Sequence, residues 1–367
     1  MPSATLSATV PWLDGSRTQR TFTRVLRKLG VSNPRNRWHS TEVEYEPGEV
    51  PQQSLEIYVD DTASILSENQ SPDIPFRFSL NPYRGCAHGC AYCYARPSHE
   101  YLGFGSGTDF ERKIVTKPRA AELLRAAFER PNWAGDTVML SGNTDCYQPL
   151  EAELGLTRQC LEVCAEYRNP VHVITKSALI ERDIDVLQRL AREASVGVTL
   201  SVTFWNAEVA RAIEPYAPTP ARRIETIRRL TDAGISVGVN VAPLIPGLSD
   251  RDLVPILEAA RAAGAVSAST QLLRLPGSTV EVFTERLRDA LPGQAEKVLK
   301  LTREMRGGKL NDPRFHMRMR GEGGYATTLL GIYEATVNRL GFPEFPEARS
   351  GTFRRPKAER QLNLFEG

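Results

Sequence analysis

Residues 81–95 of the chain read NPYRGCAHGCAYCYA, a stretch that places three of its six cysteines within eight residues. Cys86, Cys90 and Cys93 have the spacing C-x3-C-x2-C and follow the first predicted strand directly. Soft thiolate ligands this close together favour an iron-sulfur or zinc centre. Three thiolates leave a structural zinc ion one ligand short, and His88 sits awkwardly inside the cysteine span for a fourth ligand. The spacing therefore favours an iron-sulfur cluster with one open position.

Around this loop the chain alternates short apolar runs with amphipathic segments. Predicted strands cover residues 76–80 and the runs that end at Ser141, Thr175, Thr203, Ala242 and Leu273. Predicted helices between them cover residues 119–130, 157–167, 179–193, 220–233 and 249–263. Six strands separated by five helical stretches indicate βα units and a parallel sheet. A doubly wound sheet and a full or partial barrel both satisfy this pattern, and both place the site where strands end.

The regions outside this core have a different character. Residues 1–70 have no clear period, and we expect a basic, partly disordered extension whose arginines form either a nucleic-acid-binding arm or a solvated tail. The βα core covers residues 71–276. Helical patterns at 280–289, 293–306 and 327–340 predict a helical C-terminal region, residues 277–348, before a flexible tail, residues 349–367.

Composition limits the class of protein. The 46 Lys and Arg residues nearly balance the 44 Asp and Glu residues, so attraction to nucleic acid must come from local clusters. No run of about 18 apolar residues occurs, and the first residues do not resemble a secretory signal. We therefore expect a cytoplasmic protein without a membrane span. Clustered cysteines in a reducing cytosol indicate metal ligands or redox groups.

The segment CAHGCAYC, with an aromatic residue before its last cysteine, resembles the signature of the radical S-adenosylmethionine (SAM) superfamily. The resemblance implies a 4Fe-4S cluster on Cys86, Cys90 and Cys93, whose fourth iron binds SAM. It also implies reductive cleavage of SAM to a 5'-deoxyadenosyl radical that abstracts a hydrogen atom from substrate. It extends over about residues 76–273 and implies an α/β fold, the partial (β/α)6 TIM-like barrel.

Within the superfamily, six segments resemble the spore photoproduct lyase-like branch, and its uncharacterised relatives match more closely than the lyase. They read NPYRGCAHGCAYCYA, TDCYQPLE, ITKSALIERDIDVL, LSVTF, EPYAPTPARRIETI and VAPLIPGLSD. The resemblance assigns Tyr92 to the cofactor adenine and places Tyr94 near the substrate as a catalytic residue in radical transfer. The alternative for Tyr94 is a packed aromatic residue with a hydrogen-bonded hydroxyl.

The resemblance also assigns residues to contacts with SAM. It implies that Asn143, Thr144 and Asp145 bind the amino group of SAM, although these residue types also cap turns well. Lys176 and Ser201 match positions that hold the carboxylate, and a lysine at the end of a buried strand is costly without an anion. Pro243, with Ile245 and Gly247, is expected to pack against adenine.

One departure from the branch concerns the hydrogen donor. In spore photoproduct lyase a cysteine returns a hydrogen atom to the product, and the matching position here is Gly142. Cys146 lies nearby as a second catalytic candidate, either a thiol donor or a small buried hydrophobe. Cys160 and Cys164, four residues apart on a predicted helix, are interpreted as core residues.

Two further pairs of charged residues each have two alternative interpretations. Arg182 and Asp183 form either a surface pair or a helix cap, and Glu214 and Arg222 either line the cofactor pocket or pair with each other.

The tail and the arginine clusters suggest partners. QLNLF, residues 361–365 (Gln361 to Phe365), resembles the peptide by which bacterial repair proteins bind the sliding clamp; chance similarity is the alternative. We expect a radical SAM enzyme acting on DNA or another nucleic-acid component, in a lyase or DNA-repair role, with a reductant such as flavodoxin or ferredoxin. The alternatives are radical modification of a protein or small molecule, and an iron-sulfur protein used for binding or electron transfer.

Overall fold

Six parallel strands form the centre of the molecule. The structure is a computed structural model that describes residues 4–10, 20–26, 55–349 and 351–356. The strands are β5 (Phe78–Leu80), β8 (Val138–Leu140), β9 (Val171–Thr175), β10 (Val196–Ser201), β11 (Ser236–Leu244) and β12 (Ser267–Leu272). Each one pairs in parallel with the next one along the chain. Five of them lie inside the predicted apolar runs, and β11 extends two residues past the predicted end at Ala242. The predicted α/β parallel core is confirmed.

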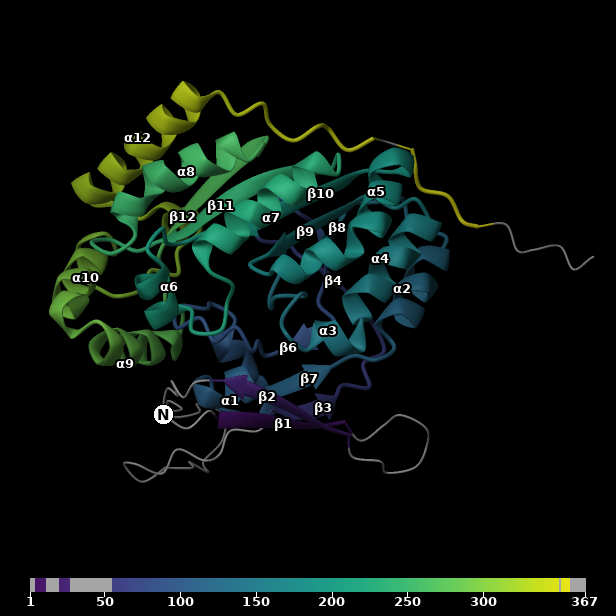
Figure 1. The fold of residues 1–367 in the computed structure, drawn as a ribbon, viewed down its shortest axis with the longest axis horizontal. Helices are drawn as coiled ribbons and strands as arrows, with labels where there is room; N and C mark the ends of the chain where they lie inside the picture. Colours follow the sequence, from purple (N-terminus) through teal and green to yellow (C-terminus); the bar gives the residue numbers. More distant parts are fainter. Residues whose placement is uncertain (1–3, 11–19, 27–54, 350, 357–367) are drawn as a thin grey trace, which may run out of the picture.

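The sheet curves as an open, partial barrel (Figure 1). The short strand β4 (Leu66–Glu68) adds to β5 in antiparallel orientation and forms one edge, and β12 forms the other. Within the part of the chain that the structure describes, these edge strands do not pair with each other. The barrel is therefore open between the edge strands β4 and β12.

Helices cover the outer face of the sheet (Figure 1). They are α2 (Ala120–Glu129), α4 (Leu156–Glu166), α5 (Ile184–Glu193), α7 (Pro220–Asp232) and α8 (Leu253–Ala262). The start of α7 has local causes: the Thr219 side chain accepts a hydrogen bond from the N–H of Arg222, and Pro220 occupies the first helical position. Apolar residues of these helices and strands pack into one continuous core.

A second, smaller sheet lies beneath the first (Figure 1). Its strands, in spatial order, are β2 (Arg20–Leu26), β1 (Ala4–Val10), β3 (Glu56–Val59), β7 (Lys113–Thr116) and β6 (Tyr83–Arg84). The sequence interpretation expected a partly disordered extension in residues 1–70 and predicted no strand there, so the strands β1 to β4 are a difference. The proposed domain boundaries remain predictions. β6 ends just before the cysteine loop and fixes where that loop begins.

The remaining elements are short or follow the core. Before β12 come α1 (Thr108–Arg112), α3 (Glu151–Leu154), α6 (Ala207–Ile213) and the 3-10 helices η1 (Arg96–Leu102), η2 (Ala178–Asp183) and η3 (Asp250–Asp252). After it come α9 (Thr279–Ala290), α10 (Pro292–Glu304), α11 (Met317–Arg320) and α12 (Gly323–Leu340). No helix among the described residues has the length and apolar character needed to cross a membrane.

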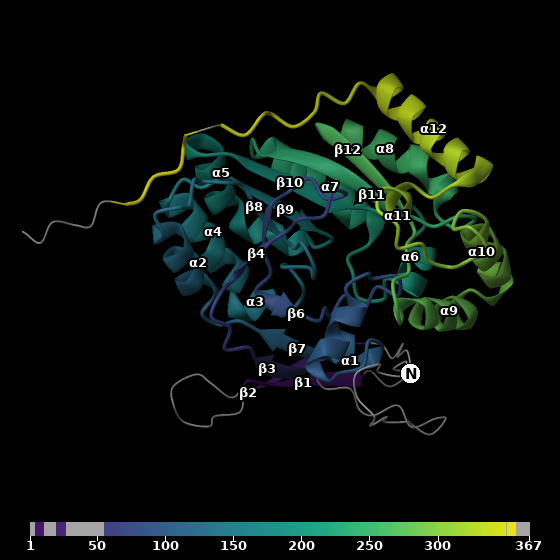
Figure 2. The ribbon, with the colours of Figure 1, turned by 180° about the vertical axis from the view of Figure 1, so that it is seen from behind.

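The C-terminal strap, residues 341–349 and 351–356, runs from α12 past the ends of the strands toward α5 and α2 in both views (Figures 1 and 2). The predicted clamp-binding segment, 361–365, lies outside the described residues.

Candidate active site

The three clustered cysteines line one cavity at the carboxyl ends of the parallel strands. Their loop is tied to the smaller sheet, because the N–H of Cys86 donates to the carbonyl of Phe110 at 2.9 Å. Gly85, with φ of 78°, lies so close to Phe110 that an added Cβ would come within 2.9 Å of that carbonyl oxygen. Glycine is therefore required at the entry to the loop.

Arg96 fixes the loop from the other side. It is fully buried, and its guanidinium donates to the carbonyls of Cys90 at 2.9 Å and Gly89 at 3.1 Å. The same group pairs with the buried Glu111 at 2.6 Å. These contacts compensate the guanidinium of Arg96 for its loss of water, whereas the second carboxylate oxygen of Glu111 has no hydrogen-bond partner among the described residues. The cysteine loop is thus held by the first residue of η1.

Cys86 and Cys90 are buried, and Cys93 is half-buried. Burial raises the pKa of all three, that of Cys90 to about 12, although the ammonium of Lys176 acts in the opposite direction on Cys90 and Cys93. A thiol must lose its proton to bind a metal, so metal loading here would release protons. Among the described residues, no three His, Cys, Asp or Glu side chains gather closely enough to hold a single metal ion.

Asp145 connects the second and third strand ends. Its carboxylate accepts from the Thr175 hydroxyl at 2.7 Å and from the N–H groups of Lys176 at 2.8 Å and Tyr147 at 2.9 Å. His88 Nδ1 lies 3.4 Å from the same carboxylate. Burial would raise the pKa of Asp145, but His88 and these donors outweigh it and lower the pKa to about 2. Asp145 is therefore an anion whose oxygens are already engaged by its own chain.

The side-chain ammonium of Lys176 is a charged group of the cavity. Its side chain is half-buried in the cavity, and its Nζ lies 5.6 Å from the centre of the Tyr92 ring. No described residue accepts a hydrogen bond from this ammonium or forms an ion pair with it. Burial opposes its charge, but the nearby Cys90 and Glu214 groups raise the pKa of Lys176. The site thus presents a protonated amine with room for an anion.

A buried network supports Tyr92. Its hydroxyl donates to Glu214 and lies 3.0 Å from the Thr203 hydroxyl, and Glu214 pairs with Arg223. Of the two alternatives for Glu214 and Arg222, pairing with each other is wrong, because Arg222 pairs with Glu181 on η2. The lining of the cavity includes neither residue. The two arginines are adjacent on α7 and so point in different directions, one inward and one outward.

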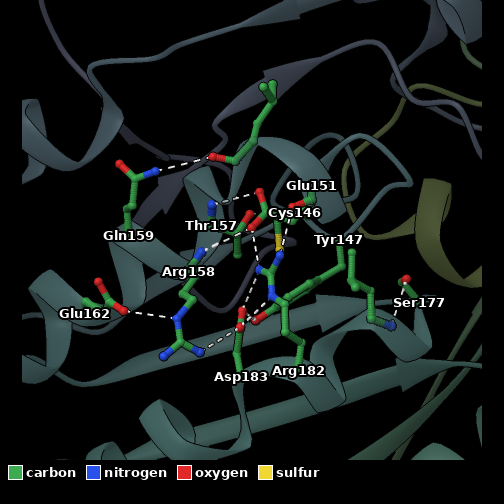
Figure 3. Close-up of polar contacts among 12 residues, drawn as sticks. Cys146, Tyr147, Glu151, Thr157, Arg158, Gln159, Glu162, Ser177, Arg182 and Asp183 are labelled. Carbon is green, nitrogen blue, oxygen red and sulfur yellow. Dashed lines mark hydrogen bonds and ion pairs between the residues drawn. The ribbon is translucent and has the colours of Figure 1, made fainter. Parts of the chain in front are cut away.

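A second network of ion pairs joins α3, α4 and η2 (Figure 3). Arg182 pairs with Glu151 and with Asp183, both at 2.7 Å, and Arg158 reaches Asp183 at 3.1 Å. The Tyr147 hydroxyl donates to Asp183 at 3.0 Å. The Arg182 to Asp183 pair is present, but Asp183 is fully buried and makes no side-chain cap on α5. The network holds the segment that follows Asp145 against η2.

The other predicted cofactor residues also line the cavity, namely Tyr92, Asn143, Thr144, Ser201 and Pro243. The Thr144 hydroxyl donates to the carbonyl of Tyr83 at 2.6 Å, which fixes its position. The Asn143 N–H donates to the Asn81 side chain at 2.9 Å. These contacts leave the Asn143 side chain facing the same space as Lys176 and the thiols.

The two catalytic candidates differ in position. Tyr94 lines the cavity, is 45% exposed, and donates its hydroxyl to the carbonyl of Gly142 at 2.9 Å. Burial of its hydroxyl, with Cys93, raises the pKa of Tyr94 to about 12. Cys146 does not line the cavity; it is fully buried in the main core, as are Cys160 and Cys164. The structure therefore brings Tyr94, and not Cys146, to the candidate active site.

The comparison with known proteins identifies the family. The profile of the Radical SAM superfamily matches residues 80–260. An uncharacterized protein of Mycobacterium bovis is 38% identical over 232 residues, which cover 63% of this chain and 68% of that protein. This chain belongs to the radical SAM superfamily. It is accordingly an enzyme of the radical SAM class.

Other relatives and solved structures agree with this membership. An uncharacterized protein of Methanocaldococcus jannaschii is 27% identical over 48% of this radical SAM chain and 64% of its own length. A mutant of spore photoproduct lyase superposes with a TM-score of 0.59 and 16% identity, covering 82% of this chain and 86% of that one. The same lyase complexed with dinucleoside spore photoproduct also gives a TM-score of 0.59. At this identity the likeness shows a shared fold.

Several cavity residues of this radical SAM enzyme were not assigned from the sequence: Ser141, Asn240, Gln271 and Arg274. Asn240 lies within β11 and Gln271 within β12, and Arg274 follows β12. Position after a parallel strand was the available signal for Arg274, whereas Asn240 and Gln271 lie inside their strands and carry no such signal.

Proposed function

We propose that Cys86, Cys90 and Cys93 hold a 4Fe-4S cluster that binds SAM at its open iron. The donor set supports this, because the buried thiols of Cys86 and Cys90 and the half-buried thiol of Cys93 line one cavity. The ammonium of Lys176, for which no described residue is a hydrogen-bond acceptor, lines the same cavity. In an iron-sulfur cluster each thiolate binds a different iron, so the three sulfurs need not meet at one point. When bound, the cluster supplies the electron that cleaves SAM to methionine and a 5'-deoxyadenosyl radical.

The residues of the chain would orient the cofactor. Lys176 and Ser201 suit the carboxylate, because a half-buried ammonium without an acceptor gains most from an anion. Asn143 and Thr144 offer short acceptors for the amino group, with Asp145 fixing their loop. Tyr92 and Pro243 offer a ring and an apolar surface for adenine. Their shared place at the strand ends supports these roles.

The substrate we propose is a nucleic-acid component, in a lyase-like or repair-like reaction. The solved lyase with this fold is complexed with a dinucleoside spore photoproduct. Tyr94 lies at the exposed side of the cavity, where a substrate would meet the cofactor. An external reductant such as flavodoxin or ferredoxin would supply the electron, and a reducing cytoplasm would keep the thiols free. Clamp binding through residues 361–365 stays a prediction.

The observation that carries this proposal is the placement of three thiols and Lys176 in one cavity. Anaerobically reconstituted protein, reduced with dithionite, should release 5'-deoxyadenosine from SAM. The triple variant Cys86→Ala/Cys90→Ala/Cys93→Ala should lose its iron absorption and this product, whereas Cys160→Ala, in the core, should keep both. An iron-sulfur protein that only transfers electrons would release no 5'-deoxyadenosine, and that result would reject the proposal.

Lys176 provides a separate test of the cofactor site. Lys176→Ala should weaken SAM binding by at least about tenfold, because a charge-assisted hydrogen bond to the carboxylate is lost. The cluster absorption should persist, since the lysine supplies no metal ligand. Binding is measured by titrating SAM into the reconstituted protein, with the exposed Lys300→Ala as the matched control. If the cluster is lost instead, the assignment of Lys176 is wrong.

A further inference from the structure

Arg274, which follows β12, is a second cation in the cavity, and no described residue forms an ion pair with it. Its guanidinium lies 5.4 Å from the centre of the Tyr94 ring. Its one hydrogen-bond contact among the described residues is a long 3.9 Å approach of Nη1 to the sulfur of Met319, a weak acceptor. A partly buried guanidinium with five donors and no oxygen acceptor is costly to the apo protein.

The neighbouring charges do not compensate Arg274. Asp73, the nearby carboxylate, has a side chain that is only 1% exposed and is already paired with Arg318 at 2.5 Å and with His316 at 3.3 Å. Burial, together with the charge of Arg318, lowers the pKa of Arg274. Arg314 is neutralised by Asp312. Among the three described arginines Arg274, Arg314 and Arg318, Arg274 is therefore the one without a carboxylate partner.

The polar groups near Arg274 suit a nucleotide. Gln271 and Asn240 also line this wall, and amide side chains can donate to and accept from the edge of a base. The Asn240 oxygen accepts from the Ser269 hydroxyl at 3.0 Å, which directs its amide. The Tyr94 ring offers a face on which a base can stack. Lys176, in contrast, lies over Tyr92, the other tyrosine of the cysteine loop.

We infer that Arg274 receives a phosphate of the nucleic-acid substrate and holds the adjoining nucleotide against Tyr94. The inference rests on the proposed function and specifies its substrate as one with a phosphodiester. The planar guanidinium matches a phosphate with two parallel hydrogen bonds, which a lysine cannot reproduce. The two cavity cations then have separate tasks: Lys176 takes the cofactor, and Arg274 takes the substrate.

Binding of a fluorescent single-stranded oligodeoxynucleotide to the reconstituted protein tests this. Arg274→Gln should weaken binding about tenfold to a hundredfold, as for one lost charge-assisted phosphate contact. The slope of log affinity against log salt should fall by about one phosphate contact. Arg320→Gln, an exposed arginine 3.8 Å from Glu334, is the matched control and should bind like wild type. Arg274→Lys should recover only part of the loss.

A neutral methylphosphonate oligomer of the same sequence separates phosphate from base contacts. It should bind wild type and Arg274→Gln equally weakly, and inorganic phosphate should compete better than acetate at equal ionic strength. Equal oligonucleotide affinity of wild type and Arg274→Gln would overturn the inference, as would a loss confined to SAM binding. If Arg274→Gln does not fold, Arg274→Lys decides, because full wild-type affinity in that variant would overturn the inference. Release of 5'-deoxyadenosine by wild type is scored separately, so the proposed function can fail on its own.

Discussion

Gly142 shows how one residue limits what the site can do. It lies just after β8, and the sequence resemblance predicts that it occupies the position of the hydrogen-donating cysteine of spore photoproduct lyase. A Cβ built on Gly142 would come 2.8 Å from Cβ of Ser79 and 3.1 Å from its hydroxyl oxygen. The neighbouring strand β5 therefore occupies the space that a thiol would need. Thymine-dimer repair by that route would require a different donor.

We predict that Gly142→Cys destabilises the protein by about 1–3 kcal/mol, because overpacking forces Ser79 to move. Ser79→Gly in the same chain should recover most of this loss. The free energy of unfolding, measured with denaturant on both single variants and the double variant, gives the coupling directly. Gly331→Cys is the control, since nothing lies near its Cβ. Additive effects of the two substitutions would show that the contact does not matter.

The sequence predicted which residues line the cavity better than it predicted the hydrogen bonds and burial of each one. The resemblance to the superfamily, together with position at strand ends, grouped Lys176, Ser201 and Asn143, which line one cavity. The saturated hydrogen bonding of Asp145 depends on Thr175 and Lys176, about thirty residues away, and no local pattern encodes it. Burial of Cys146 likewise depends on the packing of distant helices.

At the scale of elements, periodicity predicted the core and missed the smaller sheet. β9 coincides with its predicted run, and α2 and α7 begin and end close to the predicted segments. β3 and β6 are short, and their pairing with β7 brings together segments far apart in sequence. Pairing between such segments is set by tertiary contacts that a local window cannot contain.

The link between η1 and α1 gives the prediction at this scale. Arg96→Met should leave Glu111 buried without its partner, which costs about 3–5 kcal/mol. The cysteine loop would also lose its two carbonyl contacts. We therefore expect less iron per chain after reconstitution and a lower free energy of unfolding.

The double variant Arg96→Met/Glu111→Met should recover much of the stability, because two apolar side chains replace a buried pair. It should not recover full iron loading, since the carbonyl contacts of Arg96 stay absent. Arg119→Met, at an exposed arginine, serves as the control. Normal iron content in Arg96→Met would show that the loop needs no support from η1.

At the scale of the whole molecule, the C-terminal strap ties together distant parts of the core (Figure 2). Its Glu344 N–H donates to the carbonyl of Val266 beside β12, and its Arg349 N–H donates to Ser195 beside β10. Between them, Phe345 lies edge-on to His172 with 5.0 Å between ring centres. Gly238 makes room, because a Cβ there would come 2.8 Å from the Phe345 ring. The strap thus closes the amino ends of the strands, opposite the site.

This closure predicts a pH dependence of stability. Burial lowers the pKa of His172 to about 4 in the native state, whereas a histidine in the unfolded chain has a pKa near 6.5. Between these pH values the imidazole of His172 is neutral in the native state and protonated in the unfolded state. The unfolded state then binds more protons, and the free energy of unfolding falls as pH drops from about 6.5 to 4, by up to about 1.4 kcal/mol per pH unit. Above pH 6.5 the contribution is fully present.

Two variants isolate this effect in denaturant unfolding between pH 4 and 8. His172→Gln should reduce the slope while keeping a polar partner for Thr199, which lies 2.8 Å from the histidine. Phe345→Ala should lower stability by about 1–3 kcal/mol at pH 8 and also flatten the slope, because water then reaches the imidazole. His99, whose pKa burial also lowers to about 4, contributes equally to every variant. An unchanged slope in Phe345→Ala would mean that the strap does not shield His172.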